Sequence, residues 1–289
     1  MPSETVLQHM EQFGSAKIVK RCRGYLYVKF TDPEVVPSVR AVRHVVNGAS
    51  LTVEPALAKK KTWHCQIDPE FPVRVRRLGH GIVHIQNMIS MALQRQLVQR
   101  VLKLGQSPTG FYRPTFEGRQ MHLSTFCLGR HWDTRSHTYT QVRSDADGFP
   151  VPEMPTHLQE LASGIQHDLN QKCKEEMFPH MQPEACIVNH YSTEGSLGLH
   201  QDLDESEASL RAGIPVISLS LGCSARYTMD QTEMQSCLLK SGDIFIFGGP
   251  ARKLHHGIAK VFPKTTPRKL KDDMAKKPGR LNLTFRQIH

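Results

Sequence analysis

The C-terminal part of the chain limits the fold more than any other feature, because residues 185–289 are a succession of short apolar runs separated by turn residues. The runs are CIVNHY, SLGLHQD, VISLSLG, ARYTM, CLLKSGDIFIFGG, LHHGIAKV and RLNLTFRQ. Many short strands with such punctuation are typical of a β-sandwich or a jelly roll. We therefore expect the C-terminal part to fold as antiparallel β-structure.

The preceding residues supply helices to flank this β-core. Leu93, Leu97, Val101 and Leu104 have helical spacing, which predicts an amphipathic helix over residues 90–104. The other predicted segments are strands at 74–78 and 81–85, loops with short strands over 105–157, a helix over 156–177 and a basic loop at 264–279. The fold class is therefore α+β.

Composition excludes some classes of protein. The chain has 289 residues, of which 39% are hydrophobic, so it can bury a core. It has no apolar run near the roughly 18 residues of a membrane span. The N-terminal MPSETVLQHM does not resemble a secretory signal, and seven cysteines without C-x-x-C spacing argue against a disulfide framework. We expect an intracellular monomer in the nucleus, the cytoplasm or both, not secreted and not bound to membranes.

The charge is strongly basic and unevenly distributed. The net charge is +10, with a local +5 in residues 1–62 and +6 in residues 263–289. A basic patch at each end favours a polyanionic partner such as nucleic acid. The alternative is a basic surface that only contacts solvent.

The sequence His200-Gln201-Asp202 lies at the end of an apolar run. In a strand, positions i and i+2 face the same way, so His200 and Asp202 can converge on one point. A further histidine, His255 or His256, could complete a set of ligands. Two imidazoles and one carboxylate form the facial triad of non-haem Fe(II) oxygenases.

The C-terminal run alternates polar and apolar residues. In a strand, Arg280, Asn282, Thr284 and Arg286 would share one face. Two guanidinium groups on an inward face suit a doubly anionic ligand, such as a dicarboxylate that also chelates iron. The alternative is an exposed face on an edge strand.

Taken together, these motifs resemble the AlkB family of Fe(II)- and 2-oxoglutarate-dependent nucleic-acid dealkylases, over residues 80–289. The resemblance rests on NHY at 189–191, LGLHQDLDE at 197–205, SLSLG at 218–222, SGD at 241–243, HG at 256–257 and RLNLTFRQ at 280–287. It implies a double-stranded β-helix with Fe(II), 2-oxoglutarate and O2 as cofactors. The implied iron ligands are His200, Asp202 and His256. The implied 2-oxoglutarate contacts are Asn189, Tyr191, Arg280, Asn282 and Arg286.

The substrate region resembles the family less closely. Residues 105–150 differ from the family pattern in length and detail. Trp132 and Tyr139 fall in this variable region, and Asp204 matches an acidic position that contacts the base or orders the site. The alternative for Trp132 is core packing.

The N-terminal residues suggest a second module. Arg23-Gly24-Tyr25-Leu26-Tyr27-Val28-Lys29-Phe30 follows the RNP1 pattern of RNA-recognition motifs, except at Leu26. Tyr25 and Tyr27 would share a strand face with Arg23 and Lys29 and stack on unpaired bases. The expected order is a helix at 3–13, two strands within 16–30, a helix at 32–46 and a strand at 50–54, which lacks the first strand of the motif. The alternative is a structural appendage.

These patterns predict an RNA-recognition-motif-like module at 1–57, a linker and leading strand at 58–79, and an AlkB-like oxygenase domain at 80–289. The expected reaction is oxidative demethylation of N-alkylated bases, such as 1-methyladenine or 3-methylcytosine, in RNA or single-stranded DNA. It would release formaldehyde, succinate and CO2. The alternatives are an oxygenase acting on a protein or another small substrate, and a non-catalytic RNA-binding protein with a relict oxygenase domain.

Overall fold

The structure is a computed structural model, which describes residues 2–22, 25–32, 35–53, 72–116, 118–174, 177–230 and 233–289. The chain divides into two compact units, Met1–Thr62 and Trp63–His289. Residues 58–71 of the predicted linker lie outside the described residues.

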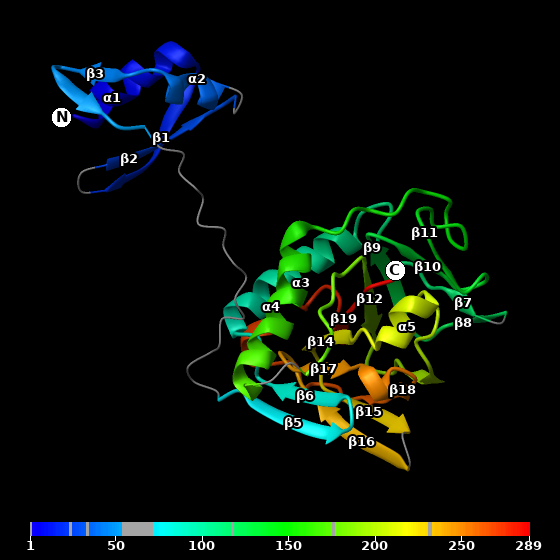
Figure 1. The fold of residues 1–289 in the computed structure, drawn as a ribbon. Helices are drawn as coiled ribbons and strands as arrows, with labels where there is room; N and C mark the ends of the chain where they lie inside the picture. The colour runs from blue at the N-terminus through cyan, green and yellow to red at the C-terminus, as the bar shows by residue number, and fades with distance from the viewer. Residues whose placement is uncertain are drawn as a thin grey trace. The chain divides into compact units, whose positions relative to one another are not determined.

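Two antiparallel sheets form the larger unit, as expected for a jelly roll (Figure 1). The seven-stranded sheet has the order β5 (Arg74–Gly79), β6 (Ile82–Gln86), β17 (Ile244–Phe247), β14 (Val216–Gly222), β19 (Arg280–Arg286), β12 (Ala185–Tyr191) and β9 (Ser124–Leu128). The four-stranded sheet has the order β13 (Leu197–His200), β18 (His255–Val261), β15 (Ala225–Asp230) and β16 (Met234–Leu239). The apolar runs of the sequence therefore predicted these strands correctly.

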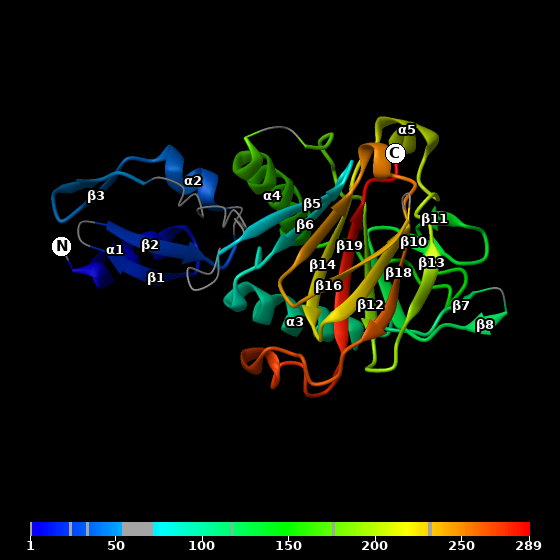
Figure 2. The ribbon, with the colours of Figure 1, turned by 90° about the horizontal axis from the view of Figure 1, so that it is seen from below.

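Helices α3 (Met91–Gly105) and α4 (Thr156–Cys173) cover one face of the seven-stranded sheet (Figure 2). Ser90 caps α3, since its hydroxyl accepts a hydrogen bond from the Leu93 amide. The apolar faces of both helices pack with Leu281, Leu283 and Phe285 of β19 in one core. None of the helices in the described part of the chain has the length and apolar character needed to span a membrane.

Strand β19 lies between β14 and β12, and all seven of its residues are buried. Its apolar residues face the helices, so its alternate residues face the four-stranded sheet. The interpretation of this run as an exposed edge strand is therefore wrong. A central strand buried on both faces carries arginines only where something on the inner face needs them.

The connecting segments contain two hairpins, which lie in the region predicted as loops with short strands. They also contain one helix that the sequence analysis did not predict. The hairpins pair β7 (Thr115–Phe116) with β8 (Arg119–Gln120), and β10 (His131–Asp133) with β11 (Thr138–Thr140). The helix is α5 (Glu207–Ala212), whose Ser206 side chain caps its first turn and whose Gly213 ends it in a left-handed conformation. Both capping residues were visible in the sequence.

The predicted loop at 264–279 is anchored to the body of the unit. Leu270 and Met274 are buried in the core beneath the helices. The Asp273 carboxylate accepts hydrogen bonds from Arg95 and Gln99 of α3, at 2.7 and 2.6 Å. The segment is therefore held in place despite its polar composition.

The smaller unit differs from its prediction. Its elements are α1 (Ser3–Met10), β1 (Ala16–Cys22), β2 (Tyr25–Phe30), α2 (Val36–Ala41), β3 (His44–Val46) and β4 (Ala49–Leu51). The predicted helix at 32–46 was wrong beyond Ala41, and β3 and β4 form a hairpin around Asn47-Gly48, both with positive φ. Among the described residues, β1–β2 and β3–β4 pair as separate two-stranded sheets. The single sheet of an RNA-recognition motif is not confirmed.

Candidate metal and cosubstrate site

Two histidines meet because β13 pairs with β18. The register places His200 directly opposite His256, and their ring centroids lie 4.4 Å apart. Gly257 permits this close approach, because a Cβ there would lie 2.6 Å from the Leu197 carbonyl oxygen. The residue after His256 must therefore be glycine for the histidines to converge.

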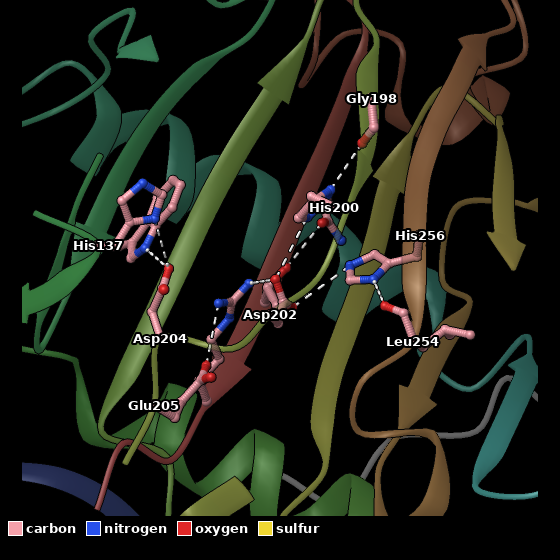
Figure 3. A network of polar contacts seen from close by, with 12 residues as sticks. His137, Gly198, His200, Asp202, Asp204, Glu205, Leu254 and His256 are labelled. Carbon is pink, nitrogen blue, oxygen red and sulfur yellow. Dashed lines mark hydrogen bonds and ion pairs between the residues drawn. The ribbon is translucent and has the colours of Figure 1, made fainter. Parts of the chain in front are cut away.

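Asp202 completes the cluster two residues beyond His200 (Figure 3). Its Oδ1 lies 3.6 Å from His200 Nε2, and its Oδ2 lies 3.7 Å from His256 Nε2. The ligand atoms all lie within 4.8 Å of one another. In the described ranges, this is the one group of three such side chains arranged closely enough to hold a metal ion.

Backbone carbonyls orient both imidazoles. His200 Nδ1 donates to the Gly198 carbonyl and His256 Nδ1 donates to the Leu254 carbonyl, each at 3.0 Å (Figure 3). Each histidine therefore carries its proton on Nδ1 and directs Nε2 at Asp202. Metal-binding histidines commonly have their second ring nitrogen fixed in this way.

Electrostatics favour the neutral form of His256 and the ionised form of Asp202, which are the forms that bind a metal. Burial lowers the pKa of His256 to about 4, so its imidazole is neutral at pH 7. Burial alone would raise the pKa of Asp202, but Arg286 and both histidines lower it well below its ordinary value. Two imidazoles that direct Nε2 at one carboxylate form a donor set that fits an Fe(II) ion.

His255 is excluded from this cluster by its position in the strand. It is exposed, whereas His256 is buried, as expected for consecutive residues that face opposite sides of a sheet. The sequence pattern alone left both histidines open, and the strand direction chooses between them.

The polar face of β19 lines the same cavity as the histidine cluster, together with Asn189 and Tyr191 of β12. Arg280 is 1% exposed and lies over the Tyr191 ring, 5.2 Å from its centroid. Its Nη2 donates to Ser220 Oγ at 3.0 Å. Its Nε and Nη1 have no hydrogen-bond partner among the described residues. A buried guanidinium with free donors fits a carboxylate of 2-oxoglutarate.

Asn282 lies on this face, but its side-chain amide hydrogen-bonds to other residues of the protein. Its Nδ2 donates to Ser218 Oγ and to the Leu219 carbonyl, at 2.8 and 2.9 Å. Its Oδ1 accepts a hydrogen bond from Thr284. Asn282 therefore lines the cavity while its hydrogen bonds hold β14 against β19.

Arg286 connects the metal cluster to the β10–β11 hairpin. Its Nη2 lies 2.7 Å from Asp202 Oδ1, and its Nη1 donates to the Tyr139 hydroxyl at 2.9 Å. Although burial lowers the pKa of Arg286, the carboxylates of Asp202 and Glu205 and the Tyr139 side chain raise it above its ordinary value. The guanidinium is therefore charged and holds the Asp202 carboxylate in place.

Trp132 and Asp204, expected to contact the substrate, lie together beside the cluster. Trp132 is half-buried, and its Nε1 donates to Asp204 Oδ2 at 2.6 Å. His137 Nδ1 lies 3.8 Å from the same oxygen (Figure 3). The His137 and Trp132 rings meet edge to face. This partly exposed aromatic and polar group could contact a planar base.

Glu205 and Arg252 were not assigned roles from the sequence. Arg252 is buried, donates to the Asp202 backbone carbonyl and lies 2.7 Å from Glu205 Oε2. Glu205 Oε1 accepts a hydrogen bond from the Tyr139 hydroxyl. A sequence signal existed for Glu205, because it belongs to the motif at 197–205. There was none for Arg252, which follows a short 3-10 turn, where no strand or helix periodicity indicates burial.

The residues predicted to bind nucleic acid in the smaller unit are placed only in part. Arg23 lies outside the described residues, and so do the side chains of Tyr25 and Tyr27 in β2. Lys29 is exposed in the same strand. Their role stays a prediction.

Comparison with known proteins agrees with this geometry. Residues 81–286 match the 2OG-Fe(II) oxygenase superfamily. The chain is 31% identical over 207 residues to an alpha-ketoglutarate-dependent dioxygenase AlkB homolog of Caulobacter vibrioides, covering 69% of this chain and 84% of the relative. The solved structure of OsALKBH1 is 36% identical, covers 74% of this chain and 100% of its own, and superposes with a TM-score of 0.69. The chain therefore belongs to the AlkB family within the 2OG-Fe(II) oxygenase superfamily.

A plant relative is also similar. It is named DNA N(6)-methyladenine demethylase ALKBH1D, from Arabidopsis thaliana, and is 38% identical over 218 residues, which cover 72% of this chain and 49% of the relative. The chain thus spans about half the length of this curated relative. The expected cofactors Fe(II), 2-oxoglutarate and O2 are those of the superfamily.

The two adjacent histidines allow a matched test of the metal site. Loss of a residue that hydrogen-bonds to a metal ligand weakens metal binding by roughly 10- to 100-fold. Loss of a ligand itself should cost more, so we expect His256→Ala to weaken Mn(II) binding by more than roughly 100-fold. His255→Ala should change it by less than about 3-fold, because that side chain faces away. Calorimetric titration of Mn(II) under anaerobic conditions measures both. Equal effects of the two substitutions would contradict the assignment.

The Arg252–Glu205 pair should stabilise the loop that carries Asp202. Removing one partner of a buried ion pair costs about 3–5 kcal/mol, so Arg252→Ala should lower the free energy of unfolding by that amount. Adding Glu205→Gln should recover part of the loss, because it removes the charge that faced Arg252, but not all of it, because Glu205 also pairs with Arg286. Urea unfolding measures both variants. The exposed pair Arg211–Glu207 serves as the control, and its loss should have no measurable effect.

Proposed function

We propose that the larger unit is an oxidative demethylase of N-alkylated nucleic-acid bases. The observation that carries the proposal is one buried cavity that contains both the His200, Asp202 and His256 cluster and the free donors of Arg280. The names of the AlkB relatives, one of which is a DNA N(6)-methyladenine demethylase, support a methylated base as the substrate.

The residues around the cavity have separate roles. His200, Asp202 and His256 would hold Fe(II), while Arg280 would bind one carboxylate of 2-oxoglutarate and Arg286 would lie near its chelating end. When bound, Fe(II) with 2-oxoglutarate and O2 supplies the oxidant that hydroxylates an N-methyl carbon, yielding formaldehyde, succinate and CO2. The protein contributes ligands, orientation and a shielded cavity.

Trp132, Tyr139 and Asp204 would contact the substrate base, with His137 beside them. The base must leave its stack to reach the cavity, which costs a few kcal/mol and favours unpaired RNA or single-stranded DNA. The basic net charge of +10 would attract the phosphate backbone in a salt-dependent manner.

The organisation proposed for the whole chain joins a double-stranded β-helix at 80–289 to a base-binding module at 1–57. In that module, Tyr25 and Tyr27 would stack on unpaired bases, and Arg23 and Lys29 on the same strand face would add positive charge. Joint substitution Tyr25→Ala and Tyr27→Ala should weaken binding of a single-stranded RNA oligomer at least about 5-fold, since each stacked base contributes about 1–3 kcal/mol. Fluorescence anisotropy measures this, and unchanged binding would remove the module from the proposal.

The demethylase proposal is tested by direct turnover. Anaerobically purified protein is incubated with Fe(II), 2-oxoglutarate, ascorbate and O2. Matched RNA and DNA oligomers contain 1-methyladenine, 3-methylcytosine or N6-methyladenine, and nucleoside mass spectrometry measures demethylation. We expect demethylation by the native chain and by His255→Ala, and its loss in His200→Ala.

The outcomes separate the alternatives. Succinate formed while every oligomer stays intact would favour an oxygenase with a protein or another small substrate. The absence of both succinate and demethylation would favour the non-catalytic RNA-binding protein. The comparison of RNA with DNA ranks the two nucleic acids.

A further inference from the structure

A second cavity lies outside the candidate metal and cosubstrate site. Its volume is about 310 Å³, and it shares no lining residue with the cavity around His200. It lies where β12 and β9 meet the segment Phe111–Arg113 and the anchored loop at 264–279, which contributes Lys277. None of the functions assigned above uses this cavity.

Two cations, Arg113 and Lys277, line this cavity. Among the residues that the structure describes, no carboxylate contributes to the wall. Burial, followed by the charge of Arg113, lowers the pKa of Lys277. In the part of the chain that the structure describes, neither side chain forms an ion pair. Two neighbouring like charges without a counter-charge favour binding of an anion.

The remaining polar groups on the wall add no negative charge. Burial, followed by the charge of Lys277, lowers the pKa of His190 to about 4, so its imidazole is neutral at pH 7. Its Nε2 donates to the Pro278 carbonyl at 3.0 Å. Ser124 and Ser192 add hydroxyl groups, which can donate hydrogen bonds to anionic oxygens.

Lys277 lies against a set of packed aromatic side chains, whereas Arg113 is exposed. Lys277 Nζ lies 4.6 Å from the centroid of the Phe111 ring, which meets the Phe126 ring edge to face at 4.8 Å. The Phe111 amide donates to the Gly105 carbonyl at the end of α3. Buried Met274 fixes the loop before Lys277. These contacts restrict the position of Lys277, which reduces the entropy that its side chain would lose on binding a ligand.

The cavity is connected to the region expected to contact the substrate. Thr134 follows β10, which carries Trp132, and its hydroxyl donates to the Thr115 carbonyl at 2.9 Å. Thr115 lies two residues beyond Arg113, just after the segment that lines the cavity. Strand β9, at the edge of the seven-stranded sheet, contributes Ser124. A nucleic-acid strand at Trp132 could therefore also run along this edge.

We propose that the cavity around Arg113 and Lys277 binds a backbone phosphate of the nucleic-acid strand whose base enters the candidate metal site. This inference rests on the proposed function and adds a second point of attachment. Phosphate matches two cations with hydroxyl donors and no acid, and phosphate contacts position a strand without reading its sequence. The site would set affinity for long substrates and leave the chemistry to the metal cavity.

The test compares two pairs of charge removals in the full chain. The joint substitution Arg113→Ala and Lys277→Ala removes the cavity cations. Arg226→Ala with Lys260→Ala removes two exposed cations that lie beside Phe262, outside the cavity. The probe is an unmethylated 12-nucleotide single-stranded DNA labelled with fluorescein, whose binding is followed by anisotropy at several salt concentrations.

We expect the cavity pair to weaken binding at least 5-fold and the control pair less than 2-fold. The dependence of log K on log salt should become shallower by about 0.7 for the cavity pair, the value for one phosphate contact on a single strand. Equal weakening by both pairs would overturn the proposal, because it would indicate general attraction. Circular dichroism and thermal unfolding check that both variants are folded.

Two further measurements identify the source of the phosphate and separate this inference from the proposed function. Adenosine monophosphate and inorganic phosphate are titrated as competitors of the oligomer. If either of them binds in a manner that depends on Lys277, while the affinity for the oligomer does not depend on Lys277, the assignment to a strand is overturned. In turnover assays, the cavity pair should raise KM for a methylated 12-mer and leave kcat unchanged. An oligomer that binds through the cavity but is never demethylated would count against the proposed function alone.

Discussion

The burial of β19 on both faces is the constraint on which the rest of the larger unit depends. Its apolar residues pack beneath α3 and α4, so its polar residues must face the inner cavity. Two guanidinium groups in such a position would be strongly destabilising without partners. Arg286 is compensated by Asp202 and Glu205, whereas Arg280 retains free donors. This difference separates an arginine that organises the metal ligands from one that is available to a carboxylate.

The same network joins the substrate region to the metal ligands. The Tyr139 hydroxyl contacts both Arg286 and Glu205, and Arg252 links Glu205 to the backbone of Asp202. A displacement of the β10–β11 hairpin would therefore disturb the carboxylate that binds the metal. Four buried or half-buried side chains therefore link the β10–β11 hairpin, where we propose that a base binds, to Asp202.

The strands and helices of the larger unit could largely be predicted from sequence, because turn residues separate runs with a clear period. Helix α5 was missed although Ser206 and Gly213 mark its ends, since six residues are too few to show a period. The predicted helix at 32–46 was wrong beyond Ala41 because the Asn47-Gly48 hairpin signal was overlooked. The predicted linker and Arg23 fall outside the described residues.

The sequence by itself determined the residue types of the site, because alternation along β19 places Arg280 and Arg286 on one face and the H-x-D motif keeps His200 and Asp202 two residues apart, although β13 ends at His200. The residue pattern left His255 and His256 open and the family resemblance implied His256, but only the tertiary structure gives the physical reason, because the register between β13 and β18 places His256 opposite His200. It also brought Arg252 beside Glu205 and Lys277 beside Arg113. Contacts between residues far apart in the chain produce no periodic pattern in the local sequence, so only the packing of the folded chain determines them.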